Sequence, residues 1–219
     1  MNDIFKMIAA LFLTTAAAGF IIAFSHASTA QLLSAQTMRQ EQAAVEQLFA
    51  KGGAIVAVKG KPPLPPRYWI AKKGAVTCGY AFLMETSGYV GPIKTVVGVD
   101  TGGSILGMAI LSQNEAPGRG ARMEERILKR PLWNGFFIGN NNVRPWFTEQ
   151  FKGIRVKRPL SIAIGTPEWP WLPEMAKKEL VDKNTISGIS GATVTSRAVV
   201  KGIEKTVAPY LAAVRGANR

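Results

Sequence analysis

A short run of hydroxyl-bearing and small residues, 187–193 (Ser-Gly-Ile-Ser-Gly-Ala-Thr), could hold or accept a phosphate group. Apolar residues recur at helical spacing from 197 to 211, just beyond it. The run therefore leads into a predicted helix, where unpaired backbone N–H groups and the positive end of the helix dipole favour an anion. Gly191 and Ala192 leave the approach to the Thr193 hydroxyl uncrowded. The alternative is an ordinary Ser/Thr helix cap beside a tight turn.

Residues 190–193 (Ser-Gly-Ala-Thr) resemble the covalent flavin attachment motif of the FMN-binding family. That family includes the G subunit of the Rnf electron-transport complex and the C subunit of the sodium-translocating NADH:quinone reductase. Four further segments look like family landmarks in the family order: 88–93 (Gly-Tyr-Val-Gly-Pro-Ile), 96–100 (Val-Val-Gly-Val-Asp), 115–120 (Glu-Ala-Pro-Gly-Arg-Gly) and 146–151 (Trp-Phe-Thr-Glu-Gln-Phe). Together with an apolar N-terminal segment, they extend the resemblance over nearly the whole chain.

The resemblance implies that Thr193 carries FMN through a phosphodiester bond, as the last threonine of the motif does in the family. The rest of the motif and the loop at 115–120 would contact the cofactor; these contacts are expected from Ser190, Gly191, Ala192, Thr195, Ser196, Glu115, Gly118 and Gly120. The flavin would supply the redox chemistry, and a separate flavin transferase would attach it. We therefore expect no catalytic residue and no metal site, and a Thr193 side chain that is exposed before modification.

The chain departs from the family pattern at two positions. The family usually has an acidic residue where Ser187 stands, three positions before the Ser/Thr that opens the motif, and Asp182 lies five residues further upstream. This departure bears on how efficiently a transferase would modify the site, and not on where it would act. Arg119 replaces an apolar residue. It would pair with a phosphate or with a neighbouring subunit, or it is a solvated loop residue.

The N-terminal segment is apolar enough to cross a membrane. No Asp, Glu, Lys or Arg occurs between Lys6 and Arg39, and about 20 predominantly apolar residues are enough to span a bilayer. Lys6 favours a cytoplasmic N terminus. We therefore expect a cytoplasmic stub and transmembrane anchor at 1–30, a connecting helix at 31–51 and one extracytoplasmic FMN-binding domain at 52–219. A cleavable signal peptide is the alternative, because residues 27–30 are small.

Turn signals divide the rest of the chain into short elements. Strands are predicted at 54–58, 75–86, 92–100, 104–112 and 154–164, and helices at 123–128, 172–181 and 197–211. The proline-rich residues 61–66 are predicted to form a rigid connector. Aromatic residues in two clusters are assigned mainly to the core: Trp133, Phe136, Phe137, Trp146, Phe147 and Phe151. Short connections favour antiparallel pairing. The fold class is therefore α+β, with a mainly antiparallel sheet and packed helices.

The formal net charge of +13 calls for a negatively charged partner. The basic residues are scattered and are not interleaved with aromatic ones, which favours membrane lipid and partner proteins over nucleic acid. Cys78 is the one cysteine and His26 the one histidine, so an internal disulfide, a Cys/His metal cluster and an iron–sulfur site are all excluded. Cys78 lies in an apolar strand and is predicted to be buried.

The resemblance implies an electron-carrying subunit of a membrane-bound, ion-translocating complex of the Rnf ferredoxin:NAD type. The soluble domain would lie on the periplasmic side of the bacterial cytoplasmic membrane. Its expected partners are the other membrane subunits, a flavin transferase and membrane lipid. The short chain favours the G subunit over the C subunit of the quinone reductase. A different class stays open, namely a basic anchored or secreted binding protein without a redox role.

Overall fold

The computed structural model describes residues 2–49, 53–62, 64–127 and 144–217, which divide into two compact units, Met1–Gln42 and Ala43–Arg219. Helix α1, Asn2–Leu48, forms the first unit and contributes its last turn to the second. Its segment Asp3–His26 is long and apolar enough to cross a membrane, judged by length and composition. Large side chains such as Phe12 and Ile22 are exposed along it, as a lipid-facing helix requires.

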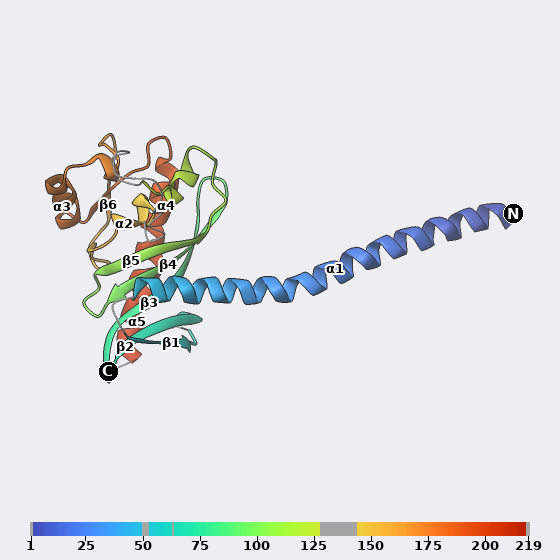
Figure 1. Cartoon of the computed structure of the whole chain (residues 1–219), viewed down its shortest axis with the longest axis horizontal. Helices are drawn as coiled ribbons and strands as arrows, with labels where there is room; N and C mark the ends of the chain where they lie inside the picture. The colour runs from blue at the N-terminus through green and yellow to red at the C-terminus, as the bar shows by residue number, and fades with distance from the viewer. Residues whose placement is uncertain (1, 50–52, 63, 128–143, 218–219) are drawn as a thin grey trace, which may run out of the picture. The chain divides into compact units, whose positions relative to one another are not determined.

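The second unit is built on a five-stranded antiparallel meander in chain order (Figure 1). The strands are β1 Ala54–Lys59, β2 Arg67–Lys73, β3 Val76–Ser87, β4 Pro92–Asp100 and β5 Ile105–Ser112. The predicted strands at 54–58, 75–86, 92–100 and 104–112 are confirmed, whereas β2 was not predicted. The connector before β2 is not a rigid rod, because the Leu64 N–H donates to the Lys61 carbonyl (2.8 Å) and closes a turn. That turn lets β1 and β2 pair.

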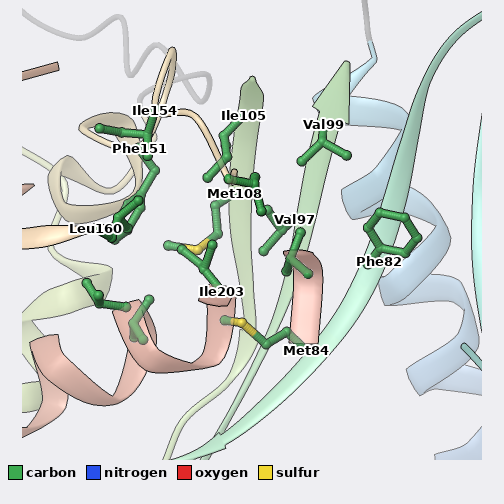
Figure 2. Packing of buried hydrophobic residues seen from close by; sticks show 14 of the residues in the cluster. Phe82, Met84, Val97, Val99, Ile105, Met108, Phe151, Ile154, Leu160 and Ile203 are labelled. Atoms are coloured by element: carbon green, nitrogen blue, oxygen red, sulfur yellow. The ribbon is translucent and has the colours of Figure 1, made fainter. Parts of the chain in front are cut away.

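The C-terminal helical run packs against one face of the sheet. It consists of α4 Thr193–Gly202, the π-helical turn η3 Ile203–Val207 and α5 Ala208–Ala217. The apolar residues predicted to form its packing face are all buried: Val199, Val200, Ile203, Val207 and Leu211. Figure 2 shows Ile203 beside Met84, Val97 and Met108 of the sheet. Pro209 follows the π turn after one residue, Ala208, and it has no N–H to give an α-helical bond.

Shorter elements complete the unit: η1 Gly120–Glu124, α2 Trp146–Glu149, η2 Trp169–Trp171, α3 Glu174–Asp182 and a parallel pair of strands, β6 Ser161–Ala163 and β7 Thr185–Ser187. The helix predicted at 172–181 is confirmed as α3. The strand predicted at 154–164 was wrong except for β6, because the Asn184 side chain satisfies backbone groups of Arg155, Arg158 and Pro159 that a sheet ladder would otherwise use. The helix predicted at 123–128 is replaced by η1, which ends at Glu124.

Two predictions about single side chains have different outcomes. Trp146, Phe147 and Phe151 are buried in the core, as predicted, whereas the cluster at 133–137 lies outside the described residues. Cys78 is exposed, so the prediction of a buried thiol was wrong. The physical reason is a register shift, since Ala71 pairs with Gly79 and Lys72 with Thr77, which leaves Cys78 without a partner in β2.

Candidate functional site: a pocket at the start of helix α4

Helix α4 begins at Thr193 without a side-chain cap. Ala192 occupies the cap position with φ −136° and ψ 48°, and no side-chain hydrogen bond closes this helix start. Gly191 precedes it with φ +75°, a conformation that favours glycine. Thr193 is therefore the first residue of the helix and not an ordinary Ser/Thr cap. The backbone N–H groups of the first turn lack a side-chain acceptor, which is the condition for anion binding at a helix start.

A pocket of about 340 Å³ opens beside this helix start. Its lining comes from the tip of the β3–β4 hairpin, the loop after β5 and α4, and consists of Tyr89, Glu115, Ala116, Arg119, Gly120, Gly191, Ala192, Thr193, Val194 and Thr195. The volume lies at the lower end of the range of roughly 300–1,000 Å³ that holds small-molecule ligands. Six residues expected to contact a cofactor thus meet in one place. Thr193 is half-buried and not exposed as expected, because it begins a packed helix.

The other three expected residues do not line the pocket. Ser196 lies beneath it, where its hydroxyl donates to the Ala192 carbonyl (3.1 Å) and accepts from the Ile189 N–H (3.0 Å). Ser190 is exposed, and its backbone N–H donates to Glu168 (3.0 Å). Gly118 is exposed in the loop with φ +73°. Ser190 and Ser196 therefore fix the backbone of the motif, and Gly118 shapes the loop.

Glu115 joins three parts of the pocket wall. The residue is 7 % exposed, and its carboxylate accepts hydrogen bonds from the Thr195 hydroxyl (2.5 Å) and the Val90 N–H (3.0 Å). A Cβ at Gly88 or Gly120 would collide with this carboxylate, so both positions require glycine. Burial raises the pKa of Glu115, but these hydrogen bonds outweigh it and hold the pKa below its ordinary value. Glu115 is therefore an ionised clamp between the hairpin, the loop and α4.

A second buried carboxylate, Glu168, supports the motif from the other side. Arg122 donates two parallel hydrogen bonds to it, each 2.8 Å, and the Ser190 N–H adds a third. Burial raises the pKa of Glu168, but the Arg122 guanidinium and Ser190 outweigh it and lower the pKa overall. Hydrogen bonding to Glu168 also raises the pKa of Arg122. Sequence reasoning missed this pair, because its partners are 46 residues apart and belong to no recognised motif.

The structure shows where the two residues that depart from the family pattern, Ser187 and Arg119, are located. Ser187 is fully buried, and its hydroxyl donates to the Pro167 carbonyl (3.0 Å). Asp182 is exposed at the end of α3, and Glu168 is the carboxylate that reaches the motif. Arg119 lines the pocket together with Thr193, which favours a role toward a bound anion. Tyr89 and Val194 also line it and were not assigned from sequence; the signal for Tyr89 was its place in the segment 88–93.

Within the described ranges, no group of three or more His, Cys, Asp or Glu side chains could hold a metal ion. The pocket instead offers helix N–H groups, small residues, one arginine and one exposed tyrosine. Residues 88–208 match the FMN-binding domain family, which places every lining residue inside the match. The chain belongs to this FMN-binding family. The donor set fits the cofactor, since the helix start suits a phosphate and the tyrosine suits a flat ring.

Curated relatives agree with this assignment. The chain is 26 % identical to the G subunit of the Na⁺-translocating ferredoxin:NAD⁺ oxidoreductase complex of Acetobacterium woodii, over 94 % of this chain and 91 % of that protein. It is also 26 % identical, with the same coverage, to the G subunit of the proton-translocating ferredoxin:NAD⁺ oxidoreductase complex of Clostridium ljungdahlii. A crystal structure of the C subunit of Na⁺-translocating NADH-quinone reductase from Parabacteroides distasonis aligns with a TM-score of 0.44 and 20 % identity, over 67 % of this chain and 62 % of that one.

The relatives are subunits of ion-translocating oxidoreductase complexes, which supports a redox role for this chain. Its FMN-binding domain supports FMN as the cofactor. The apolar helix segment Asp3–His26, together with relatives from ion-translocating complexes, fits a single-pass membrane protein.

Proposed function

We propose that this chain is the electron-carrying G-type subunit of an Rnf-type ferredoxin:NAD oxidoreductase complex and that it holds FMN through a phosphodiester to the Thr193 hydroxyl oxygen. One observation carries the proposal. Thr193 is the first residue of a helix without a side-chain cap, it lines the pocket, and it lies within the FMN-binding match. A phosphate bonded to its side chain would lie next to the free N–H groups of the first helical turn.

Attachment would be a phosphoryl-group transfer. The Thr193 oxygen would form a new P–O bond to the flavin-bearing phosphorus of an activated flavin donor, the phosphoanhydride bond of the donor would break, and its other phosphate-bearing part would leave. No ionisable side chain that would serve as a general base forms a hydrogen bond with Thr193 among the described residues. Glu115, the carboxylate in the pocket, accepts from Thr195 and Val90 instead. We therefore assign the base that takes the hydroxyl proton to a separate flavin transferase.

Bound FMN would supply one- and two-electron redox chemistry. The chain's own residues would hold it in place: the start of α4 receives the phosphate, and Ser196 and Glu168 fix the turn that carries Thr193. Thr195 would steady the phosphate end, and Ser190, which lies outside the pocket lining, would act through the backbone of the turn. Glu115 and Gly120 would wall the ring or the ribityl chain, and Gly118, which does not line the pocket, would shape their loop.

We place residues 1–30 as the cytoplasmic stub and anchor, 31–51 as the connecting helix and 52–219 as the FMN-binding domain on the extracytoplasmic side. The other complex subunits and membrane lipid would meet its basic surface. The named relatives favour the G-type subunit over the C subunit of the quinone reductase. The alternative was a basic anchored or secreted binding protein without a redox role. The match to the FMN-binding family favours the redox role over this alternative.

The test is to produce the full chain in cells that contain a flavin transferase and to examine denatured protein on a gel for flavin fluorescence. We expect a fluorescent band for the wild type and none for Thr193→Ala. Ser190→Ala is the matched control, because it removes a hydroxyl from the same motif outside the pocket lining; this variant should stay fluorescent. A dark wild-type band, or a fluorescent Thr193→Ala band, would contradict the proposal.

A further inference from the structure

The tip of the β3–β4 hairpin carries an exposed aromatic side chain into the pocket wall. Tyr89 is 70 % exposed and lines the pocket, whereas the neighbouring Val90 is exposed without lining it. The turn is tight, since the Gly88 N–H donates to the Gly91 carbonyl (2.8 Å). Because Tyr89 lines the pocket, its ring offers a flat apolar face that a planar ligand in the pocket would cover. The position of Tyr89 therefore suggests a flat ligand as its partner.

The hairpin tip is fixed relative to Thr193 and is not a free loop. Glu115 accepts from the Val90 N–H, one residue after Tyr89, and from the Thr195 hydroxyl, two residues after Thr193. The carboxylate thus connects the aromatic ring and the attachment point through short hydrogen-bonded links. A cofactor tethered to Thr193 would meet a wall whose position is already set, which limits the entropy lost on ordering it.

We infer that Tyr89 stacks on the isoalloxazine ring of the flavin and that Glu115 is the positioning residue that holds Tyr89 there. The inference rests on the proposed covalent FMN and adds the residue that contacts its ring. Aromatic rings prefer offset-stacked or edge-to-face contact, and a phenol is an electron-rich partner for the electron-poor oxidised flavin. Stacked tyrosine also quenches flavin fluorescence by donating an electron to the excited ring. Tyr89 would therefore keep the bound flavin dim and favour its oxidised form.

The experiment uses the full chain, flavinylated in cells and purified in detergent. Intact mass first gives the amount of covalent FMN, and the fluorescence per bound flavin of the native protein is then measured. Tyr89→Leu keeps apolar bulk but removes the ring, so we expect unchanged flavin content and fluorescence several-fold brighter than the wild type. Tyr89→Trp restores an electron-rich ring and should be dim. Val90→Ala, the neighbouring exposed residue, should also be dim.

Glu115 is tested by the same measurement. Glu115→Ala removes both acceptor oxygens, so the hairpin tip should loosen and the fluorescence per bound flavin should rise. Glu115→Gln keeps a carbonyl oxygen for the Val90 N–H and should stay near the wild-type value. A bright flavin in Glu115→Ala and a dim flavin in Glu115→Gln would show that the hydrogen bonds of residue 115 position Tyr89. A general loss of fold would brighten the flavin in both variants.

The outcomes are distinguishable. A wild-type chain without covalent FMN overturns the proposed function and this inference with it. A wild-type chain with covalent FMN and a Tyr89→Leu variant as dim as the wild type overturns the stacking alone. A bright Tyr89→Leu variant with a Glu115→Ala variant as dim as the wild type overturns the positioning role of Glu115.

Discussion

The sheet core and the pocket at the start of α4 are held together in different ways. The core is apolar and closed; Phe82, Val97 and Phe147, for example, have no exposed surface. The pocket end is held by two buried carboxylates, Glu115 and Glu168, each with several hydrogen-bond donors. Apolar packing can be replaced by similar volumes at modest cost, whereas a buried carboxylate left without donors is expensive. The core therefore depends on filled volume, whereas the pocket depends on the pairing of particular polar groups.

The largest effect on stability should come from the core. Phe147→Ala removes a ring that meets Trp146 and Phe151 edge to face, at centroid distances of 5.8 Å and 5.4 Å. We expect a loss of about 3–5 kcal/mol in the free energy of unfolding, because the cavity it leaves cannot collapse fully. Urea unfolding followed by tryptophan fluorescence measures this change. Val76→Ala, at a position 68 % exposed, should stay within about 0.5 kcal/mol; equal effects of the two variants would refute the described core.

The next effect should come from Glu168. Glu168→Ala removes the carboxylate that accepts two hydrogen bonds from Arg122 and one from the Ser190 N–H. We expect a loss of about 1–2 kcal/mol, reduced by the partial exposure of Arg122, together with a lower yield of covalent flavin, since the motif turn loosens. Glu125→Ala is the control, because Glu125 bonds the same arginine from a more exposed position. A control that lowers flavin yield as much as Glu168→Ala would show that the turn does not depend on Glu168.

Acid should protonate the two pocket carboxylates and remove their contribution to the free energy of unfolding, while the apolar core has no group to protonate. The pKa values of Glu115 and Glu168 are lowered in the folded chain from an ordinary 4.5. Their contribution is therefore complete above the unfolded pKa and is lost as pH falls through the folded pKa. We expect stability to decline below about pH 4.5, and the Glu115→Gln/Glu168→Gln double variant to decline less steeply. Thermal melts across that range provide the measurement, and parallel curves for both proteins would count against the assignment.

The smallest effect on stability should come from Arg119. Arg119→Leu restores the apolar residue of the family pattern on an exposed part of the pocket loop, so stability should change by less than about 0.5 kcal/mol. The midpoint potential of the flavin should fall, because a nearby cation favours the more negatively charged reduced form. Spectroelectrochemical titration measures it. Arg126→Leu, an exposed arginine that does not line the pocket, should leave the potential unchanged; an unchanged potential in Arg119→Leu would place Arg119 away from the ring and the phosphate.

The core was predictable from local patterns. Apolar runs bounded by turn signals identified β3, β4 and β5, and helical spacing identified the packing residues of α4 and α5, because both signals lie in residues that are close in the sequence. β2 was missed where proline-rich sequence masks its start. The strand predicted at 154–164 failed because Asn184, some 20–30 residues away, satisfies the backbone.

The pocket was predictable only where a motif marks it. Thr193, Gly191, Ala192 and the loop 115–120 were found in this way. The hydrogen bond from Thr195 to Glu115 spans 80 residues, and the pairing of Arg122 with Glu168 spans 46. Contacts at such separations depend on the folded path of the chain, and no local pattern records them. Tyr89 lies on a recognised segment, but its role depends on where the hairpin tip is held.

One measurement tests the central claim most directly. Trypsin cleaves after lysine and arginine, so the peptide 184–197 is released from wild-type protein made with a flavin transferase. Fragmentation mass spectrometry of this peptide should show the added mass of FMN less one water on Thr193. An unmodified peptide at full yield, or the added mass on Ser190, Thr195 or Ser196, would contradict the account.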